Sequence, residues 1–410
     1  MSRLALSDAD KEARDWFIET AKARNCSTTV DAMGNIFAVR PGRRQGPPTF
    51  AGSHLDTQPA GGRYDGILGV TSGIEMIQVL DDHWVETEFP VGVVNWTNEE
   101  GARFPISMLA SGVWAGEIPL SHAHELREVG HGNAGATVAS ELARIGYLGS
   151  TPCSHEATPM AAHFELHIEQ GPTLESTSRK VGIVHGAQAY RWFTIEVTGR
   201  AAHTGATSFA HRADALLAAA RMVSYARAAA EKHGALASTG IMNVEPGSTN
   251  TVPGHVKFSL DVRAAKDHIV DAVEEELRNA FSAIAKGEMP SGVGMMQDAE
   301  KGKPCIVEWT TDSNSPAIDF HEDCISCVRK SAEATVGDET DLTMDMRSGA
   351  GHDSVYASRQ CPTSMIFVPC KDGVSHNPEE YTAPEDCAIG AQVLLGAVLR
   401  FDRLRARRGW

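Results

Sequence analysis

The chain has 410 residues, with 53 Asp and Glu against 37 Lys and Arg, and its formal net charge is −16. This acidic balance argues against nucleic-acid binding, which needs clustered basic side chains. A chain of this length is expected to form two domains, and it contains no run of about 18 apolar residues that would span a membrane. Eight cysteines and a charged N-terminus, MSRLALSDADKEARDWF, predict a cytoplasmic protein without a disulfide framework.

The first part of the chain alternates strand-like and helical segments, as in an α/β sheet. Apolar runs predict strands at residues 49–53, 91–96 and 162–168, and far downstream at 365–369. Helices are expected between them, at residues 69–80 and in the alanine-rich stretch 134–145.

The middle of the chain follows a different order of elements. The pattern predicts a strand, a long helix, two strands, a helix and a strand, at residues 191–198, 208–232, 240–245, 255–263, 266–286 and 304–310. This βαββαβ order is typical of a self-contained α+β unit. We therefore expect an α/β catalytic domain of residues 1–187 and 314–410, with a smaller α+β domain inserted at 188–313.

Side chains of the types that commonly bind metals follow four of the apolar strands. They are His54 and Asp56 in AGSHLDT with Asp65 in GGRYDG, Glu99 and Glu100 in NWTNEEG, His167 in HFELHIEQG, and His376 in MIFVPCKDGVSH. Ligands of open α/β sheets gather at the carboxyl ends of strands, so these segments can converge. Two histidines with Asp65 and Glu100 would make a nitrogen and oxygen donor set suited to zinc, manganese, cobalt or nickel.

Each of these motifs also fits a structural role when taken alone. A histidine at a strand end more often makes only a structural hydrogen bond, and an Asp before a glycine is typical of a turn. Glu99 and Glu100 could be a solvated loop pair. In HFELHIEQ, His163 and His167 share one strand face, and spacing alone does not choose between them.

The adjacent glutamates have a mechanistic logic. Neighbouring side chains on an extended segment point to opposite sides, so one can bind metal while the other faces the substrate. A metal lowers the pKa of its water towards about 7. A free glutamate beside that water can take its proton and return it to the leaving nitrogen.

Other chemistries are less favoured. The GxGxxG match at residues 130–135 follows a charged segment rather than a strand, so it does not predict a dinucleotide site. The single CxxC of Cys324 and Cys327 lies in a helical stretch and lacks the second pair of a zinc site. A nucleophilic Cys370 would leave the carboxylates without a role.

Together the motifs resemble the hydantoinase/carbamoylase branch of the dinuclear metal amidohydrolases, which are relatives of the aminoacylases and carboxypeptidase-type metallopeptidases. The resemblance runs from about residue 3 to about residue 385. It includes GSHLDTQPAGGRYDGILGV, NWTNEEGARF, ELHIEQGPTLE, AAHTGAT, NVEPGSTNTVPG, FSLDVR, SGAGHDS and MIFVPCKDGVSH. It implies a metallopeptidase-like mixed sheet whose inserted α+β domain serves as a lid and dimerisation domain in a homodimer.

The resemblance also implies the metal centre. Two divalent ions, zinc or manganese with cobalt or nickel as alternatives, would be held by His54, Asp65, Glu100, His167 and His376. Asp65 would bridge the two ions. Asp56 would orient His54 from behind, and Glu99 would be the general base.

Substrate residues are implied in the same way. His203 in the AAHTGAT loop would reach the partner subunit's active site and stabilise the oxyanion. One departure follows it, since Thr207-Ser208-Phe209 stands where relatives commonly carry a Thr-Pro-Met-like run. The larger and stiffer Phe209 puts the selectivity for the substrate side chain in doubt.

The substrate carboxylate would be held by Asn250 and Arg263, with Gln170 nearby. Strand alternation in HVKFSLDVR independently places Arg263 on the polar face, and a guanidinium suits a carboxylate. The glycine-rich loop at Gly349 and Ala350 would line the pocket, because glycines allow close approach of the main chain.

These features predict a hydrolase of non-peptide C–N bonds in linear amides. The expected reaction converts an N-carbamoyl-L-amino acid or N-carbamoyl-β-alanine to the free amino acid, ammonia and carbon dioxide. GGRYDG and NEEGARF favour carbamoylases and β-ureidopropionases. The alternatives are an allantoate amidohydrolase, or a dipeptidase or aminoacylase of the same superfamily. A non-catalytic binding protein is less favoured, because the ligand positions and the base are intact.

Overall fold

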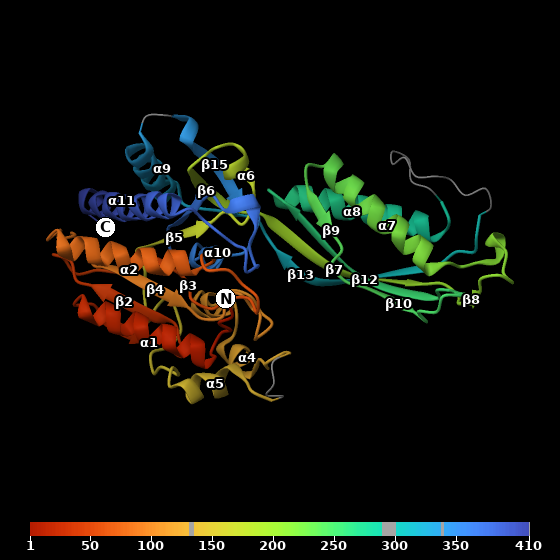
Figure 1. The fold of residues 1–410 in the computed structure, drawn as a ribbon, viewed down its shortest axis with the longest axis horizontal. Coiled ribbons are helices and arrows are strands. Elements are labelled where there is room, and N and C mark those ends of the chain that lie inside the picture. Colours follow the sequence, from red (N-terminus) through yellow and green to blue (C-terminus); the bar gives the residue numbers. More distant parts are fainter. Residues whose placement is uncertain (131–134, 289–300, 338–339, 410) are drawn as a thin grey trace. The chain divides into compact units, whose positions relative to one another are not determined.

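The computed structural model describes residues 1–130, 135–288, 301–337 and 340–409. They form two compact units, which we call unit 1 (Met1–Gly186 with Asp319–Trp410) and unit 2 (Ala187–Ile318) (Figure 1). Most of the GxGxxG match at 130–135, and the predicted helix start at residue 134, lie outside the described residues. No helix in the described part of the chain is long and apolar enough to cross a membrane.

Unit 1 is built on a mixed nine-stranded sheet with the order β1-β2-β4-β3-β5-β16-β6-β14, in which β15 pairs with β6. The strands are β1 (Ser27–Val30), β2 (Ile36–Arg40), β3 (Thr49–His54), β4 (Val91–Trp96), β5 (Ala162–Ile168), β6 (Val181–Ala187), β14 (Ile318–Asp319), β15 (Thr343–Ser348) and β16 (Thr363–Val368). The middle strands β4, β3, β5 and β16 run parallel and are buried along their whole length. Such strands are apolar throughout because both faces are covered, which is why their positions could be predicted.

Helix α11 packs against α2 and against α9, and all three helices contact this sheet, while α1 packs against β1 and β2, and α10 against β5 and β16. The helices of unit 1 are α1 (Asp8–Ala23), α2 (Ile67–Asp82), α3 (Leu109–Trp114), α4 (Leu120–Glu125), α5 (Val138–Ile145), α6 (Thr173–Ser176), α9 (Glu322–Val336), η2 (Thr340–Leu342), α10 (Asp353–Ala357), η3 (Lys371–Gly373) and α11 (Pro384–Arg408). The mixed sheet with its helical cover confirms the predicted fold class.

Unit 2 is a five-stranded antiparallel sheet with the order β10-β12-β7-β13, in which β9 pairs with β12. Helices α7 and α8 lie side by side against it (Figure 1). Its elements are β7 (Ala189–Thr198), β8 (Ala202–His203), η1 (Phe209–His211), α7 (Ala215–Lys232), β9 (Leu236–Ser238), β10 (Met242–Glu245), β11 (Thr251–Val252), β12 (His255–Ala264), α8 (Asp267–Ala285) and β13 (Ile306–Ser315). The predicted βαββαβ order is present, with the short strands β8, β9 and β11 added.

One helix start was wrong. The long helix of unit 2 begins at Ala215 rather than at residue 208, because Asp214 accepts a hydrogen bond from the Leu217 amide at 2.9 Å and caps it. In β12, alternate residues are buried as predicted, so Arg263 lies on the face of the sheet opposite the buried apolar side chains.

The parallel strands of unit 1 place the polar segments. Strands β3, β4, β5 and β16 all run the same way, so their carboxyl ends lie at one edge of the sheet, at His54, Trp96, Ile168 and Val368. The four predicted metal-binding segments follow these ends and therefore start from one region of the molecule.

Candidate active site

Two groups of potential metal ligands meet at this edge of the sheet. His54, Asp65 and His167 form the first, which we call the buried cluster. Asp65, Glu100 and His376 form the second, the loop cluster. The Asp65 Oδ1 atom lies 3.5 Å from His54 Nε2 and 3.1 Å from His167 Nε2, whereas Oδ2 lies 3.4 Å from His376 Nε2. Asp65 thus presents one oxygen to each cluster, as a bridging ligand does.

Backbone carbonyls fix the histidine rings of the buried cluster. His54 Nδ1 lies 3.0 Å from the carbonyl oxygen of Asp56, and His167 Nδ1 lies 2.8 Å from that of Ile168. Each Nδ1 therefore carries the hydrogen, which leaves each Nε2 as an acceptor. The Nε2 of His54 has no hydrogen-bond partner in the described part of the chain, whereas that of His167 accepts one from the Gly66 amide at 3.2 Å. The expected orienting role of the Asp56 side chain is not what the structure presents, since its carboxylate oxygen is 3.9 Å from His54 Nδ1.

The Asp56 carboxylate has another use. It accepts hydrogen bonds from the backbone amides of Glu99 at 3.3 Å and Glu100 at 3.2 Å, and so fixes the turn that presents both glutamates. Their side chains then separate. Glu100 Oε2 lies 3.3 Å from His376 Nε2, in the loop cluster, while Glu99 Oε2 lies 3.6 Å from His54 Nε2.

The clusters concentrate negative charge in a buried region, which favours the binding of cations. Burial raises the pKa of Glu99 well above its usual range and also raises that of Glu100. Burial opposes the protonation of His54, but Glu99 and the neighbouring aspartates outweigh it and raise the pKa of His54. Asp56, Asp65, Glu99 and Glu100 are four carboxylates in one buried region, and two divalent ions would balance their charge.

The donor atoms fit such ions. His54 Nε2 is buried without a hydrogen-bond partner, which is costly unless something fills that position. Each cluster contributes imidazole nitrogen and carboxylate oxygen within 4.8 Å, the set preferred by zinc, manganese, cobalt or nickel.

A third group behind the clusters is already satisfied. Glu165, His167 and His352 also lie close enough to share an ion. However, the Glu165 carboxylate accepts hydrogen bonds from the hydroxyls of Ser53 at 2.8 Å and Ser354 at 2.7 Å. Burial lowers the pKa of His352 to about 3, so its imidazole is neutral. This ring packs edge-on against the His167 ring, with 4.5 Å between the ring centres.

The structure separates the two histidines that spacing left undecided. His167 belongs to the buried cluster. His163 Nε2 instead lies 3.3 Å from the Trp96 indole nitrogen, which donates to it. Burial lowers the pKa of His163 to about 4, so the ring stays neutral as a core residue.

Gln170, predicted to bind substrate, contacts the clusters directly. Its amide nitrogen donates to Asp65 Oδ2 at 2.7 Å and to the Ser375 hydroxyl at 3.2 Å. Its Oε1 is buried without a partner among the described residues. In the glycine-rich loop, the Ala350 amide donates to Ser348 Oγ at 3.1 Å, and the same Oγ lies 2.9 Å from His352 Nε2.

Comparison with known proteins identifies the family of this chain. Residues 50–400 match the model of peptidase family M20/M25/M40. An N-carbamoyl-L-amino-acid amidohydrolase from Rhizobium meliloti is 38% identical, covering 97% of this chain and 90% of that protein. The structure of an amidase of the hydantoinase/carbamoylase family from Burkholderia multivorans has a TM-score of 0.87 at 42% identity, covering 97% of this chain and 92% of that one. The chain belongs to the hydantoinase/carbamoylase family.

Relatives in this family differ in the substrate they are named for. A ureidoglycolate hydrolase from Arabidopsis thaliana is 32% identical, covering 96% of this chain and 80% of that protein. This hydantoinase/carbamoylase-family chain is thus an amidohydrolase that acts on C–N bonds, and its particular substrate is a separate question.

Two predicted substrate residues of the amidohydrolase lie together in unit 2. The Thr204 amide donates to the Asn250 carbonyl at 3.0 Å, which joins the His203 loop to the loop before β11. His203 Nδ1 accepts hydrogen bonds from the amides of Gly205 at 3.1 Å and Ala206 at 3.2 Å. The imidazole hydrogen therefore sits on Nε2, and this exposed side chain offers an N–H donor.

Arg263 is held in place by its neighbours on the sheet of unit 2. It forms an ion pair with Asp261 at 2.9 Å, and its guanidinium lies 5.3 Å from the centre of the Tyr190 ring. Tyr190 is also its partner in the β7–β12 register. A stacked and paired guanidinium of this kind presents a fixed fork of donors.

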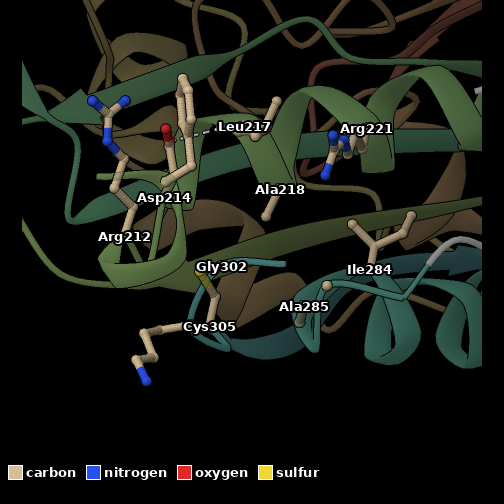
Figure 2. A pocket seen from close by; sticks show the side chains of 12 residues that line it. Arg212, Asp214, Leu217, Ala218, Arg221, Ile284, Ala285, Gly302 and Cys305 are labelled. Carbon is tan, nitrogen blue, oxygen red and sulfur yellow. Dashed lines mark hydrogen bonds between the residues drawn. The ribbon is translucent and has the colours of Figure 1, made fainter. Parts of the chain in front are cut away.

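A cavity of about 450 Å³ lies elsewhere in unit 2, beside α7 and the end of α8 (Figure 2). Leu217 and Ile284 contribute apolar walls, and the carboxylate of Asp214 is used to cap α7 (Figure 2). Its lining includes Phe209 but none of the residues predicted to bind metal or substrate. This cavity therefore contains no member of the two ligand clusters of unit 1.

The cysteines do not provide a competing site. Burial raises the pKa of Cys370 to about 11, so its thiol is protonated at neutral pH and is a poor nucleophile. Cys324 and Cys327 are buried free thiols within α9, where they serve as small apolar side chains.

Proposed function

We propose that this amidohydrolase hydrolyses the carbamoyl C–N bond of an N-carbamoyl amino acid, either an N-carbamoyl-L-amino acid or N-carbamoyl-β-alanine. The products are the free amino acid, ammonia and carbon dioxide. The observation that carries the proposal is the pair of ligand clusters sharing Asp65, with Glu99 beside them and outside both groups. The named activity of the Rhizobium meliloti relative supports the substrate class.

In this proposal His54 and His167 would hold one divalent ion, Glu100 and His376 would hold the other, and Asp65 would contribute to both positions. The ions would be zinc or manganese, with cobalt or nickel as alternatives. When bound, they would polarise the carbamoyl carbonyl and acidify the attacking water.

Glu99 moves the protons. Its carboxylate takes a proton from the attacking water and delivers it to the nitrogen that leaves. Burial raises the pKa of Glu99, which makes its carboxylate a stronger base than an exposed one. Asp56 assists by holding the backbone amide of Glu99.

Residues of unit 2 bind the rest of the substrate in this proposal. His203 donates its Nε2 hydrogen to the developing oxyanion of a partner subunit's active site, within a homodimer. Arg263 and Asn250 bind the substrate carboxylate, and Gln170, Gly349 and Ala350 contribute from unit 1. The tautomer of His203 and the fixed guanidinium of Arg263 support these roles. Unit 2 is accordingly proposed as the lid and dimerisation domain.

A second candidate is ureidoglycolate hydrolysis, which the Arabidopsis thaliana relative favours. Ureidoglycolate is itself an N-carbamoyl derivative that carries a carboxylate, so the same donors would bind it. Allantoate, dipeptides and N-acyl amino acids are the remaining candidate substrates.

A substrate panel tests the proposal. Metal-free protein is reconstituted separately with manganese, zinc, cobalt and nickel. Ammonia release is then measured from N-carbamoyl-β-alanine, several N-carbamoyl-L-amino acids, ureidoglycolate and allantoate. An N-acetyl amino acid and a dipeptide, read by amine release, serve as controls. Metal-dependent turnover of an N-carbamoyl amino acid above all others supports the proposal, whereas preferential turnover of any other substrate overturns it.

A further inference from the structure

We propose that Glu380 is a positioning residue of the metal centre, which ties the loop carrying Asp65 to the loop carrying His376. The proposal rests on the metal-binding roles given to these two residues under the proposed function. Sequence reasoning did not single out Glu380, because it stands beside a second glutamate, Glu379, in the polar stretch NPEEYT.

The Glu380 carboxylate spans the two loops. Its Oε1 accepts hydrogen bonds from the backbone amides of Tyr64 at 2.9 Å and Asp65 at 3.1 Å. Its Oε2 accepts one from the Ser375 hydroxyl at 3.0 Å. One side chain therefore fixes the backbone of the bridging Asp65 and the residue directly before His376.

The chain is built to admit this carboxylate. Glu380 is only 4% exposed, and a buried carboxylate is costly unless its oxygens are hydrogen-bonded. A Cβ atom added at Gly62 would lie 2.0 Å from Glu380 Oε1. Glycine at this position of GGRYDG is therefore needed for the carboxylate to reach the amides of Tyr64 and Asp65.

The contacts favour one side of Asp65. Ser375 Oγ lies 2.9 Å from Asp65 Oδ2 as well as 3.0 Å from Glu380 Oε2, and its single hydrogen can serve only one carboxylate at a time. Gln170 donates to the same Oδ2. These groups surround the oxygen that faces His376, whereas Oδ1 faces the histidines of the buried cluster.

Glu380 should therefore act mainly on the loop cluster. The rings of His54 and His167 are fixed by carbonyls at the strand ends, which do not depend on Glu380. His376 lies in a loop and its side chain is 51% exposed. Loss of Glu380 would release the Asp65 backbone and Ser375. The affinity for the ion in the loop cluster would then fall more than the affinity for the ion in the buried cluster.

The test is a Co²⁺ titration of chelator-stripped protein, followed by visible absorption and by the metal content per chain. Wild-type protein should bind two ions. Glu380→Ala should lower the affinity for the ion of the loop cluster about 10–100-fold, the usual effect of removing a group that supports a ligand. It should change the affinity for the ion of the buried cluster by less than about threefold. Glu380→Gln keeps one carbonyl oxygen and should recover part of the loss.

Glu379→Gln is the matched control, because it removes the same charge one residue earlier from an exposed side chain. It should leave both affinities unchanged. Ser375→Ala is a milder second variant, which should weaken the same ion by a smaller factor. It decides the question if Glu380→Ala does not fold.

Wild-type affinity at both ions in the folded Glu380→Ala variant would overturn the proposal. Equal weakening of both ions with a lower melting temperature of the metal-free protein would do so too, since that indicates a general structural role. If wild-type protein itself fails to bind two Co²⁺ ions, the proposed metal centre fails instead, and the two failures are thereby distinguished.

Discussion

The two ligand clusters share a carboxylate but are built differently. In the buried cluster, His54 and His167 are each 1% exposed, lie on strands of the central sheet and are oriented by backbone carbonyls. In the loop cluster, His376 is half exposed and has a left-handed backbone with φ of 54°. Gln58 donates hydrogen bonds to both oxygens of Glu100. In this cluster the ligand is thus oriented by a neighbouring residue rather than by the sheet. We therefore expect the sheet to preform one metal position and side-chain hydrogen bonds to adjust the other.

The largest effect is expected where the two clusters meet. Asp65→Ala removes the ligand common to both, so metal content should fall towards zero. Turnover should drop by about 1000-fold or more, because the ions provide several kcal/mol of transition-state stabilisation and about 1.4 kcal/mol is a factor of ten. Metal analysis and turnover check this. Asp372→Asn, at an exposed position of η3 with a left-handed backbone that Asn tolerates, is the control and should behave as wild type.

Next in size is the loss of the base. Glu99→Gln keeps the shape of the side chain but cannot accept a proton, so turnover should fall by about 10²–10⁴ while both ions remain bound. Glu100→Gln should instead reduce the metal content of the loop cluster. Parallel measurement of kcat and metal per chain separates them, and unchanged turnover in Glu99→Gln would remove this residue from its role.

The comparison itself is tested by single histidine variants. His376→Ala should leave about one ion per chain, with little change in the melting temperature of the metal-free protein, because half of the side chain is exposed. His167→Ala removes a buried ring. It should lower the affinity for the ion of the buried cluster and also lower the melting temperature of the metal-free protein. Calorimetry and metal titration decide. The same loss in both variants would mean that the clusters are not distinct.

The smallest effect is expected from pH. Burial opposes protonation of His54, but nearby carboxylates raise its pKa, and Asp65 raises the pKa of His376. The two protonated histidines therefore contribute to the free energy of unfolding of the metal-free protein. This contribution is fully present below about pH 6.5, the ordinary histidine pKa, and is lost as the pH rises through the raised pKa values. Burial raises the pKa of Glu99, with the same sign.

The melting temperature of metal-free protein should consequently fall as the pH rises above about pH 6.5, while that of metal-loaded protein changes less, because metal ligands are already deprotonated. Replacing His54 should flatten the metal-free curve more than replacing the half-exposed His376. A metal-free melting temperature that rises over this range would contradict the assignment.

What the sequence predicts depends on how local the cause is. The strands ending at His54, Trp96 and Ile168 are continuous apolar runs, so their positions follow from composition. The predicted start of α7 was wrong because a single capping residue, Asp214, decides where the helix begins. Asp56 contacts His54 with its backbone carbonyl rather than with its side chain. This contact depends on the geometry of a turn, which no residue pattern specifies.

Contacts between distant segments are the hardest to predict. Glu379 and Glu380 are identical neighbours in the sequence, yet one is exposed and the other is buried against the Asp65 loop. His163 and His167 share a strand face, and only the surrounding core separates them, with Trp96 beside one and Asp65 beside the other.

The shared carboxylate of Asp65 has a consequence for metal exchange. Because each oxygen faces a different cluster, filling one position changes the charge and the orientation available to the other. The two proposed binding events would therefore be coupled, and by thermodynamic reciprocity any factor by which the first ion changes the affinity for the second would apply equally in reverse. A chain holding two different metals would thus have affinities set by the identity of the neighbour, and neither position has an intrinsic metal preference that can be measured while the other varies.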